Sequence, residues 1–590
     1  MKREFCLDIE GDSYAIGDLN LFLDNKENIQ YPPIDPMHPK HPFFTGMIRQ
    51  NVQIDQETRT FLLYIPENFP ISGAGIFLFL ENGMDAEAFL KQSCWKKIAE
   101  ENRTALILLE SKAGGWDRRN IQSEVDYSEK VFRKAISRVY FSLNEATYYI
   151  IGLGDGAYVA TAYALLNSAL FAAMAMDGDY QLHPALLAQL GQIRSDRDAA
   201  LSKLDVAIPA WLIRADAEEG GAILDGLKRA CCTVDRGLHN DYADVFQQNM
   251  KQYMVSLDGL PMAEVWFTGK TLREKMSPET RSRAMADFVL HFKRWLGIGN
   301  GDLRPARTEE DMKLKKQSKE IDGRMREWLI YEPSAYRNQP DRKLPVVLAI
   351  HGYSCTGELF AENTQWHVIG EKRGFLVVYV SAYPSNGISG GHTVPLPAWN
   401  ALSIHTETDD VKYIKTVLQE VKAAYPVDEE RIYVSGHSNG SLLTNLLMEE
   451  MPLSFAAFAP QGAPYHLDVQ NDASARKRRI KPDGILRPVW LMMGHEDIGD
   501  QDSLKPDSIN TLFLNMMCEV NGLERTQNSY LENGKYCTVT FSDQAHVPLL
   551  RFTGVQDLPH TYTPEMAQMF WDQFFCHFRR KADGSIQYTE

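Results

Sequence analysis

The chain is too long, at 590 residues, for one ordinary hydrophobic core, and its length therefore predicts two or more domains. Its content of 44% apolar and 24% charged residues is typical of a globular protein in water. The net charge of −16 argues against nucleic acid or an anionic membrane surface as the main partner.

The first residues and the cysteines bear on location and cofactors. Residues 1–8 carry acidic side chains where a secretory signal needs an apolar core, and no segment is long and apolar enough to cross a bilayer. The eight cysteines are scattered and include no C-x-x-C pair, which fits reduced thiols and indicates no zinc site. We therefore expect a cytoplasmic protein that binds no membrane, uses no metal and needs no cofactor.

One pattern of strands and helices occurs twice along the chain. The aligned segments, in chain order, are 59–66 with 326–333, 95–100 with 366–371, 148–156 with 432–440, 209–213 with 488–492, and 277–279 with 563–565. In each copy, apolar strands alternate with amphipathic helices such as residues 409–424, which predicts a mostly parallel sheet with helices on both faces. The sequence thus predicts an α/β fold in two tandem copies.

The domain boundaries follow from composition. Residues 297–305 are rich in Gly and Pro and suit a linker. The expected organisation is an amino-terminal extension (1–43), a first domain (44–298), a linker (299–320) and a second domain (321–590).

Residues 436–440, Gly-His-Ser-Asn-Gly, form the most informative motif of the chain. A β-branched strand (431–435) precedes this motif and a helix (441–450) follows it. A serine in such a strand–turn–helix context points its hydroxyl above the sheet, while the flanking glycines permit the sharp turn. Ser438 is therefore the predicted nucleophile.

In the segments 326–333, 345–352, 399–400, 409–411, 425–440 and 455–460, the second half resembles a known family. It is similar to α/β-hydrolase serine esterases of the polyhydroxybutyrate depolymerase and feruloyl esterase type, which are related to carbohydrate esterase family 1. The resemblance covers residues 320–580. It implies two tandem α/β-hydrolase domains, of which the first is a degenerate copy.

A serine hydroxyl needs a basic partner, and the base needs an orienting carboxylate. In this fold the chain order is serine, acid, histidine, each after the end of a strand. Asp497 follows the strand 488–493 and best matches the position of the family's acid. Asp500 and Asp502 on the same loop are the alternatives, and Glu496 is the weakest candidate.

His560 is the predicted base. It follows the expected last strand (547–554) and comes just before the terminal helix (564–578), as the family's histidine does. We interpret His546 and His495 as exposed loop histidines and His577 as a structural residue of the helix.

An oxyanion hole and a substrate wall complete the predicted site. The backbone N–H groups of Asn439, which follows the nucleophile, and of Tyr353, assigned by the family resemblance, are the expected oxyanion donors. The loop 381–400 contains three candidate substrate contacts, Tyr383, His392 and Trp399, although packing against the sheet is the alternative for its aromatic residues. His437, within the motif, is the fourth candidate contact.

The first copy lacks these chemical groups. Alignment places Gly154 opposite Ser438, Glu218 near Asp497 and Glu274 opposite His560, and it places Asn82 where His351 stands. Without a hydroxyl and an imidazole this copy cannot perform acyl transfer by the same route. We expect it to shape the mouth of the pocket, bind part of the substrate or form an oligomer.

The predicted function is that of a serine carboxylesterase acting through an acyl-enzyme. Phenolic esters of the feruloyl type, short hydroxyalkanoate esters and acetyl esters are the expected substrates. An acyltransferase or a peptidase with the same triad is the nearest alternative. A non-catalytic binding protein built from two hydrolase copies is the alternative from another class.

Overall fold

A computed structural model describes most of the chain in two compact units. The described residues are 34–39, 45–54, 56–70, 72–136, 143–195, 201–216, 221–248, 262–294, 303–389, 392–401, 406–465, 480–495, 497, 504–505 and 508–590. The first unit runs to Ala306 and the second begins at Arg307, with residues 34–39 joining the second unit and residues 388–394 the first. Among the described residues, no helix combines the length and the apolar character needed to cross a membrane.

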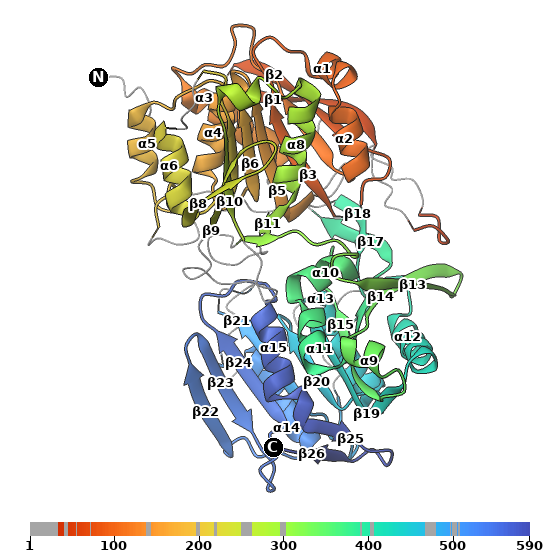
Figure 1. Ribbon diagram of the computed structural model, residues 1–590. Coiled ribbons are helices and arrows are strands. Elements are labelled where there is room, and N and C mark those ends of the chain that lie inside the picture. Colours follow the sequence, from red (N-terminus) through yellow and green to blue (C-terminus); the bar gives the residue numbers. More distant parts are fainter. Residues whose placement is uncertain are drawn as a thin grey trace. The chain divides into compact units, whose positions relative to one another are not determined.

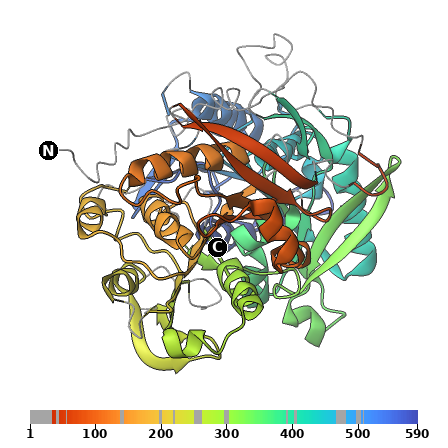
Figure 2. The ribbon, with the colours of Figure 1, turned by 90° about the horizontal axis from the view of Figure 1, so that it is seen from above.

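The first unit is built on a ten-stranded sheet with the order β1-β2-β4-β3-β5-β6-β7-β10-β9-β8. Its strands are β1 (Gly46–Ile54), β2 (Glu57–Ile65), β3 (Gly73–Phe79), β4 (Ala105–Leu109), β5 (Leu143–Leu153), β6 (Ala173–Asp177), β7 (Ala210–Ile213), β8 (Thr233–His239), β9 (Asp244–Gln248) and β10 (Glu264–Thr268). The central strands from β4 to β10 pair in parallel, and the strands at both edges pair antiparallel. The edge pair β1–β2 forms the long red ribbon of Figure 2.

Helices cover both faces of this sheet (Figure 1). They are α1 (Ala86–Gln92), α2 (Trp95–Asn102), α3 (Ile121–Ile136), α4 (Gly156–Leu166), α5 (Pro184–Leu190), α6 (Gly221–Ala230), α7 (Lys270–Arg273) and α8 (Pro278–Leu290). A short antiparallel pair, β11 (Phe292–Arg294) and β12 (Leu303–Pro305), follows them. Helices α2 and α8 contact each other, as do α3 and α4, so that each face carries its own helical layer.

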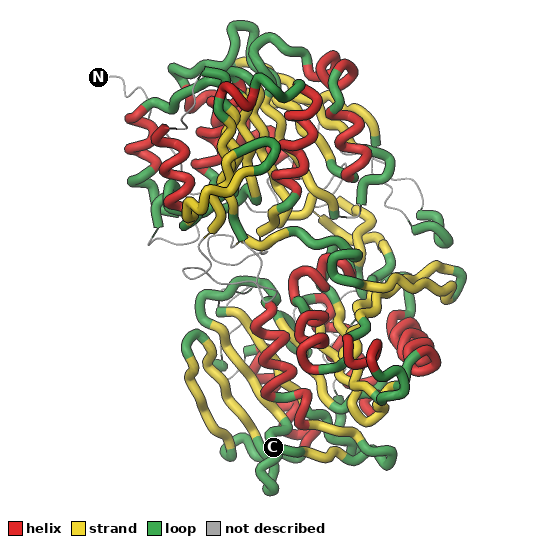
Figure 3. The backbone as a smooth tube through the Cα atoms, in the orientation of Figure 1, coloured by secondary structure: helices red, strands yellow, loops and turns green. Residues whose placement is uncertain are grey.

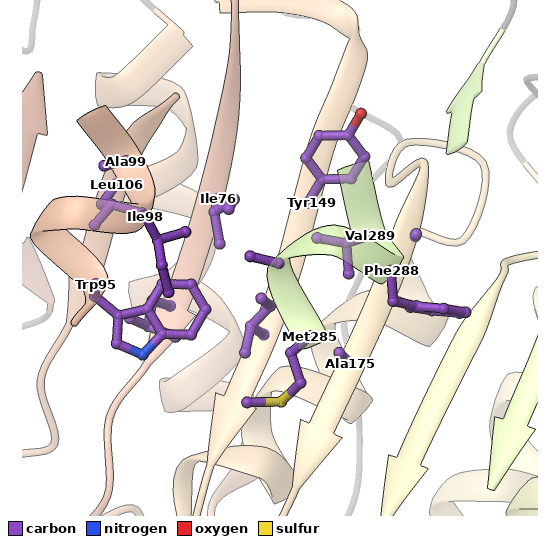
Figure 4. Close-up of a cluster of buried hydrophobic side chains, with 14 of the residues drawn as sticks. Ile76, Trp95, Ile98, Ala99, Leu106, Tyr149, Ala175, Met285, Phe288 and Val289 are labelled. Carbon is purple, nitrogen blue, oxygen red and sulfur yellow. The ribbon is translucent and has the colours of Figure 1, made fainter. Parts of the chain in front are cut away.

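The layer formed by α2 and α8 encloses a large apolar core, shown in Figure 4. Trp95 from α2, Tyr149 from β5 and Phe288 from α8 are all buried there. The Tyr149 hydroxyl donates a hydrogen bond of 2.8 Å to the carbonyl oxygen of Phe292, so its polar end is satisfied within the core. Burial of a side chain of this size contributes about 1.5–3 kcal/mol.

The second unit repeats the same sheet, with the order β13-β14-β16-β15-β19-β20-β21-β24-β23-β22. Its strands are β13 (Leu314–Ile321), β14 (Arg324–Tyr331), β15 (Leu344–Ile350), β16 (Leu376–Val380), β19 (Val427–His437), β20 (Ala457–Gln461), β21 (Val489–Gly494), β22 (Asn528–Asn533), β23 (Tyr536–Phe541) and β24 (Leu550–Val555). A short pair, β25 (Phe578–Arg580) and β26 (Ile586–Tyr588), follows the sheet. The α/β class predicted for both halves is confirmed.

Helices again flank the sheet on both sides, in red beside the yellow strands of Figure 3. They are α9 (Ser334–Asn338), α10 (Gly357–Thr364), α11 (Trp366–Arg373), α12 (Asp410–Ala424), α13 (Asn439–Glu450), α14 (Ile509–Asn521) and α15 (Pro564–Gln573), with short 3-10 turns at η3 (Pro452–Ser454) and η5 (Phe575–His577). Side-chain caps define several helix starts. Asp409 accepts a hydrogen bond from Lys412 N at the start of α12, and Thr563 caps α15, whose first residue is Pro564.

Part of the segment 381–400, which the sequence predicts to be a loop, forms two strands. Residues 384–389 and 392–397 form β17 (Pro384–Ser389) and β18 (His392–Pro397), which pair as a two-stranded sheet. The Gly- and Pro-rich composition of this segment therefore concealed a pair of strands.

Matching side-chain contacts occur at matching places in the two units. The Arg59–Glu124 ion pair of the first unit and the Arg326–Asp410 ion pair of the second are both buried, each at 2.7 Å. The indole N–H groups of Trp211 and Trp490 each donate a 2.8 Å hydrogen bond to a threonine hydroxyl, of Thr268 and Thr553 respectively. These contacts establish which residues of the two units are structurally equivalent.

Candidate active site

Ser438 lies at a sharp turn between β19 and α13. Its φ of 53° is uncommon for a non-glycine residue, and together with its ψ of −118° it gives a strained backbone conformation. A side chain at Gly436 would collide with the carbonyl oxygen of Gly440, and one at Gly440 would collide with the carbonyl oxygen of Ile350. The two glycines thus let the turn form against the sheet, as a nucleophile elbow requires.

Asp497 and His560 form a close pair near the same end of the sheet. His560 Nδ1 lies 2.5 Å from Asp497 Oδ1, and the carboxylate is buried while the imidazole is a quarter exposed. Asp497 follows β21 and His560 follows β24, which is the parallel neighbour of β21. A side chain at Gly494 would strike the carbonyl oxygen of Leu558, so this glycine permits the acid loop and the base loop to approach each other.

The serine elbow lies close to the base. The strands β19, β20, β21 and β24 are consecutive parallel neighbours, so their carboxyl ends share one edge of the sheet. The imidazole rings of His437 and His560 lie 4.7 Å apart between centroids. A Cβ built on Gly462, whose φ is 74°, would lie 3.1 Å from His560 Cε1 and 3.3 Å from His437 Nδ1. The structure therefore brings the elbow and the His560–Asp497 pair together.

The expected oxyanion donors flank the nucleophile. Asn439 is the first residue of α13, at the helix end where backbone N–H groups have no partner within the helix. A Cβ on Gly352, the residue before Tyr353, would lie 3.3 Å from Ser438 Cβ, so the loop that carries Tyr353 passes directly beside the serine. Both predicted donors thus lie on segments next to Ser438.

Trp399 links Asn439, the residue after the nucleophile, to His351. Its backbone N–H donates to Asn439 Oδ1 at 2.7 Å, and its indole N–H donates to the carbonyl oxygen of His351 at 2.7 Å. Asn439 Nδ2 returns a hydrogen bond of 3.2 Å to the carbonyl oxygen of Trp399. Because the tryptophan is fully buried, its position gives the predicted substrate contact no support and indicates a supporting role.

His351 is a buried neutral histidine. Its Nδ1 lies 2.6 Å from the carbonyl oxygen of Gly352, and its Nε2 accepts a hydrogen bond of 2.9 Å from Ala382 N. One nitrogen must therefore carry the proton and the other must not, which fits only the neutral ring. Burial accordingly lowers the pKa of His351 to about 4, and Arg326 contributes in the same direction.

The other predicted residues make contacts elsewhere, are exposed, or lie outside the described residues. Tyr383 is buried beneath the guanidinium of Arg324, which lies 5.6 Å from the ring centroid, so its predicted substrate contact also gains no support. The side chain of His392 and the residues Glu496, Asp500 and Asp502 lie outside the described residues. His495 and His546 are exposed. The terminal helix ends at Gln573 and not at residue 578 as predicted, so His577 lies in the 3-10 turn η5, where its ring nitrogen contacts the carbonyl oxygen of Thr589.

Sequence reasoning missed Gln461. This residue ends β20, its amide contacts His437 Nδ1, and it donates a hydrogen bond of 2.9 Å to the carbonyl oxygen of Thr561. The sequence feature that could have indicated Gln461 is its position at the end of β20, the strand that neighbours β19. A polar residue after the apolar segment 455–460 resembles any strand end, so the sequence alone did not distinguish it.

The first unit keeps the elbow without the chemistry. Gly154 has a φ of 53°, matching that of Ser438, and its N–H donates to Asp177 O as Ser438 N does to Gln461 O. A Cβ on Gly154 would lie 2.7 Å from Glu81 Cγ, so the glutamate side chain occupies the space of a nucleophile. Glu274 ends the short helix α7, and Glu218 lies outside the described residues.

The predicted equivalence of Asn82 with His351 is wrong. The strand registers pair Phe79 with Gly152 and Ile350 with Gly436, so that Leu80 is the residue matching His351. The alignment had followed the glycine after each strand, but the turns differ in length. Asn82 instead donates to Asp155 Oδ2 at 2.8 Å and accepts from Trp116 N at 2.8 Å.

No group of three or more His, Cys, Asp or Glu side chains arranged to hold a metal ion occurs within the described part of the chain.

Residues 330–472 match the family model "Esterase PHB depolymerase". The curated proteins that align with the chain include the following three. The bifunctional acetylxylan esterase/xylanase XynS20E of Neocallimastix patriciarum is 28% identical over 20% of this chain and 16% of its own length. Acetylxylan esterase A of Aspergillus ficuum is 29% identical over 22% of this chain and 39% of its own length, and poly(3-hydroxyalkanoate) depolymerase C of Paucimonas lemoignei is 30% identical over 20% and 28% respectively.

Among solved structures, an acetyl xylan esterase from Aspergillus awamori aligns with 44% of this chain and 98% of its own length, at 17% identity and a TM-score of 0.33. The fold assignment of each unit rests on its own strand order. The chain spans 16% to 39% of the length of the first curated relatives that it matches.

The strand order and the serine elbow give the second unit the fold of an α/β-hydrolase. The sequence of the second unit is similar to PHB depolymerases and acetylxylan esterases.

Proposed function

We propose that the protein is a serine carboxylesterase whose nucleophile is Ser438, whose base is His560 and whose orienting acid is Asp497. One observation carries this proposal. The strained serine elbow and the His560–Asp497 pair lie at one edge of the same sheet, on neighbouring parallel strands. A serine, a base within reach and a carboxylate that orients the base are the parts that acyl transfer needs.

In the proposed reaction, Ser438 Oγ attacks the ester carbonyl while His560 Nε2 accepts the hydroxyl proton. Asp497 accepts the Nδ1–H hydrogen bond, which fixes the tautomer that leaves Nε2 free to act as a base. The N–H groups of Tyr353 and Asn439 stabilise the oxyanion. His560 then protonates the leaving alcohol, and water hydrolyses the acyl-enzyme by the same steps in reverse.

Small acyl groups lead the proposed substrates. The matching relatives carry the names acetylxylan esterase and poly(3-hydroxyalkanoate) depolymerase, so acetyl and short hydroxyalkanoate esters rank first and phenolic esters follow. The first unit is proposed to be a duplicated copy that has no esterase activity, because its elbow holds Gly154 and its nucleophile space holds Glu81.

A panel of p-nitrophenyl esters of increasing acyl length tests the activity. Wild-type protein should hydrolyse the acetyl and butyryl esters, and Ser438→Ala should reduce kcat by at least about 10³-fold. Turnover that survives in Ser438→Ala, or a wild-type protein without turnover on any ester, would contradict the proposal.

A further inference from the structure

Gln461 contacts both halves of the proposed catalytic machinery. Its backbone carbonyl oxygen accepts a hydrogen bond of 2.9 Å from Ser438 N. Its side-chain Nε2 donates one of 2.9 Å to the carbonyl oxygen of Thr561, the residue after His560. One fully buried residue therefore links the nucleophile turn to the loop of the base.

The orientation of the Gln461 amide follows from its partners. The carbonyl oxygen of Thr561 can only accept, so the amide nitrogen must face it and the amide oxygen must face the other way. The amide oxygen then meets His437 Nδ1, which must carry a proton to donate to it. Burial, together with the neighbouring His560, lowers the pKa of His437 to about 3, which keeps the ring neutral and able to hold this tautomer.

The ring of His437 also lies against the ring of His560, with 4.7 Å between centroids. His437 is the residue directly before the nucleophile, so the contact runs from the elbow to the base. A second link connects the same two segments, because the hydroxyl groups of Ser435 and Tyr562 lie 2.9 Å apart. The two residues that follow His560, Thr561 and Tyr562, are thus bound to Gln461 and Ser435 respectively.

The first unit lacks this arrangement. In the strand registers, Leu153 occupies the position that corresponds to His437, and Asp177 occupies the position that corresponds to Gln461. Leucine cannot donate a hydrogen bond, and the Asp177 carboxylate instead accepts from Arg273 and Arg281, each at 2.8 Å. The first unit therefore has no counterpart of the His437–Gln461 contact, and Asp177 reaches the segment after β10 through its ion pair with Arg273 instead.

We propose that His437 and Gln461 are positioning residues for the esterase reaction, in which the imidazole of His437 orients the Gln461 amide and the amide holds the His560 loop at its working distance from Ser438. This inference rests on the proposed function. Misplacement of a catalytic group by about 1 Å can cost 10²-fold in rate, so loss of the link should reduce kcat more than KM.

The test uses the full chain and four single variants assayed with p-nitrophenyl acetate. Gln461→Met keeps the side-chain length but removes both hydrogen bonds, and Gln461→Glu can accept from His437 but cannot donate to Thr561. His437→Phe keeps a ring without a donor, whereas His437→Asn supplies an amide N–H near the position of Nδ1. We expect kcat to fall about 10- to 100-fold in the first three, with KM nearly unchanged, and His437→Asn to restore much of the loss seen in His437→Phe.

A matched control separates positioning from general destabilisation. Asn521 is also a buried amide with two hydrogen bonds to backbone groups, both to Arg487, and Arg487 precedes β21 at the opposite end of the strands from Ser438. Asn521→Leu should lower the melting temperature as Gln461→Met does, yet leave kcat unchanged.

The double variant Gln461→Met/His437→Phe should be no slower than the slower single variant, because both changes break one link. Wild-type kcat in Gln461→Met, or an equal loss of kcat in Asn521→Leu, would overturn the inference while leaving the esterase activity established. A wild-type protein without ester turnover would instead overturn the proposed function.

Discussion

At the level of single residues, the contact between Asp497 and His560 sets the tautomer of the proposed base. Asp497 Oδ1 accepts from His560 Nδ1, and an amide at position 497 could instead donate to that nitrogen and reverse the tautomer. We therefore expect Asp497→Asn to reduce kcat by about 10⁴-fold with little change in KM. Steady-state kinetics of Asp497→Asn, compared with those of Asp500→Asn and Asp502→Asn, test the assignment. A larger loss of kcat in either of the latter two variants would identify that residue as the acid.

His351 predicts a dependence of stability on pH. Its pKa is about 4 in the folded protein because of burial, and about 6.5 in the unfolded chain. Between these values the unfolded state binds more protons, so stability is complete above about pH 6.5 and declines as the pH falls toward about 4. The shift corresponds to a loss on the order of 3 kcal/mol at the acid end of this window.

Urea denaturation at pH 7.5 and pH 5 measures this effect in wild type and in His351→Gln. The variant should be less stable at pH 7.5 but should lose less stability on acidification. Parallel losses in the two proteins would show that protonation of His351 does not oppose folding.

At the level of elements, a buried ion pair joins strand β14 to helix α12 and supports the oxyanion region. Arg326 donates to Asp410 Oδ1, while Asp410 Oδ2 accepts from Asn400 N at 2.7 Å, next to Trp399. Removal of one partner leaves a buried unpaired charge, which typically costs about 3–5 kcal/mol. Asp410→Ala should therefore lower the melting temperature and also reduce kcat, since Trp399 holds Asn439.

The first unit supplies the control for this prediction. Glu124→Ala breaks the equivalent pair with Arg59 and should also lower the melting temperature. It should leave kcat unchanged when the assay is run below both unfolding transitions. Equal effects of the two variants on kcat would show that the Asp410 contact has no specific role in the site.

The sequence allowed the main elements to be predicted because their signals are local. Apolar strands, the glycine pair around Ser438 and the amphipathic pattern of residues 409–424 depend on neighbouring residues only. The burial of Trp399 and the role of Gln461 depend on contacts between distant segments, such as the 100-residue separation of Gln461 and Thr561. The equivalence of Leu80 with His351 required the strand registers, which a turn of different length conceals in the sequence.

At the level of the whole molecule, two units of the same topology carry one copy of the proposed catalytic groups, in the second unit. The first unit should stay inactive even when a serine is restored. In Gly154→Ser the new Cβ would lie 2.7 Å from Glu81 Cγ, and no histidine occupies the place of His560. Combined with Ser438→Ala, neither Gly154→Ser nor Gly154→Ser/Glu81→Gly should hydrolyse any ester of the panel, and recovered turnover would reveal a second base in the first unit.

Covalent labelling identifies the nucleophile directly. The full chain is treated with a fluorophosphonate and the site of modification is located by peptide mass spectrometry. We expect one adduct per chain, on Ser438. We expect no adduct in Ser438→Ala, and none in His560→Ala, in which loss of the base slows the reaction. An adduct on any other serine in the wild-type protein, or labelling that persists in Ser438→Ala, would contradict the account.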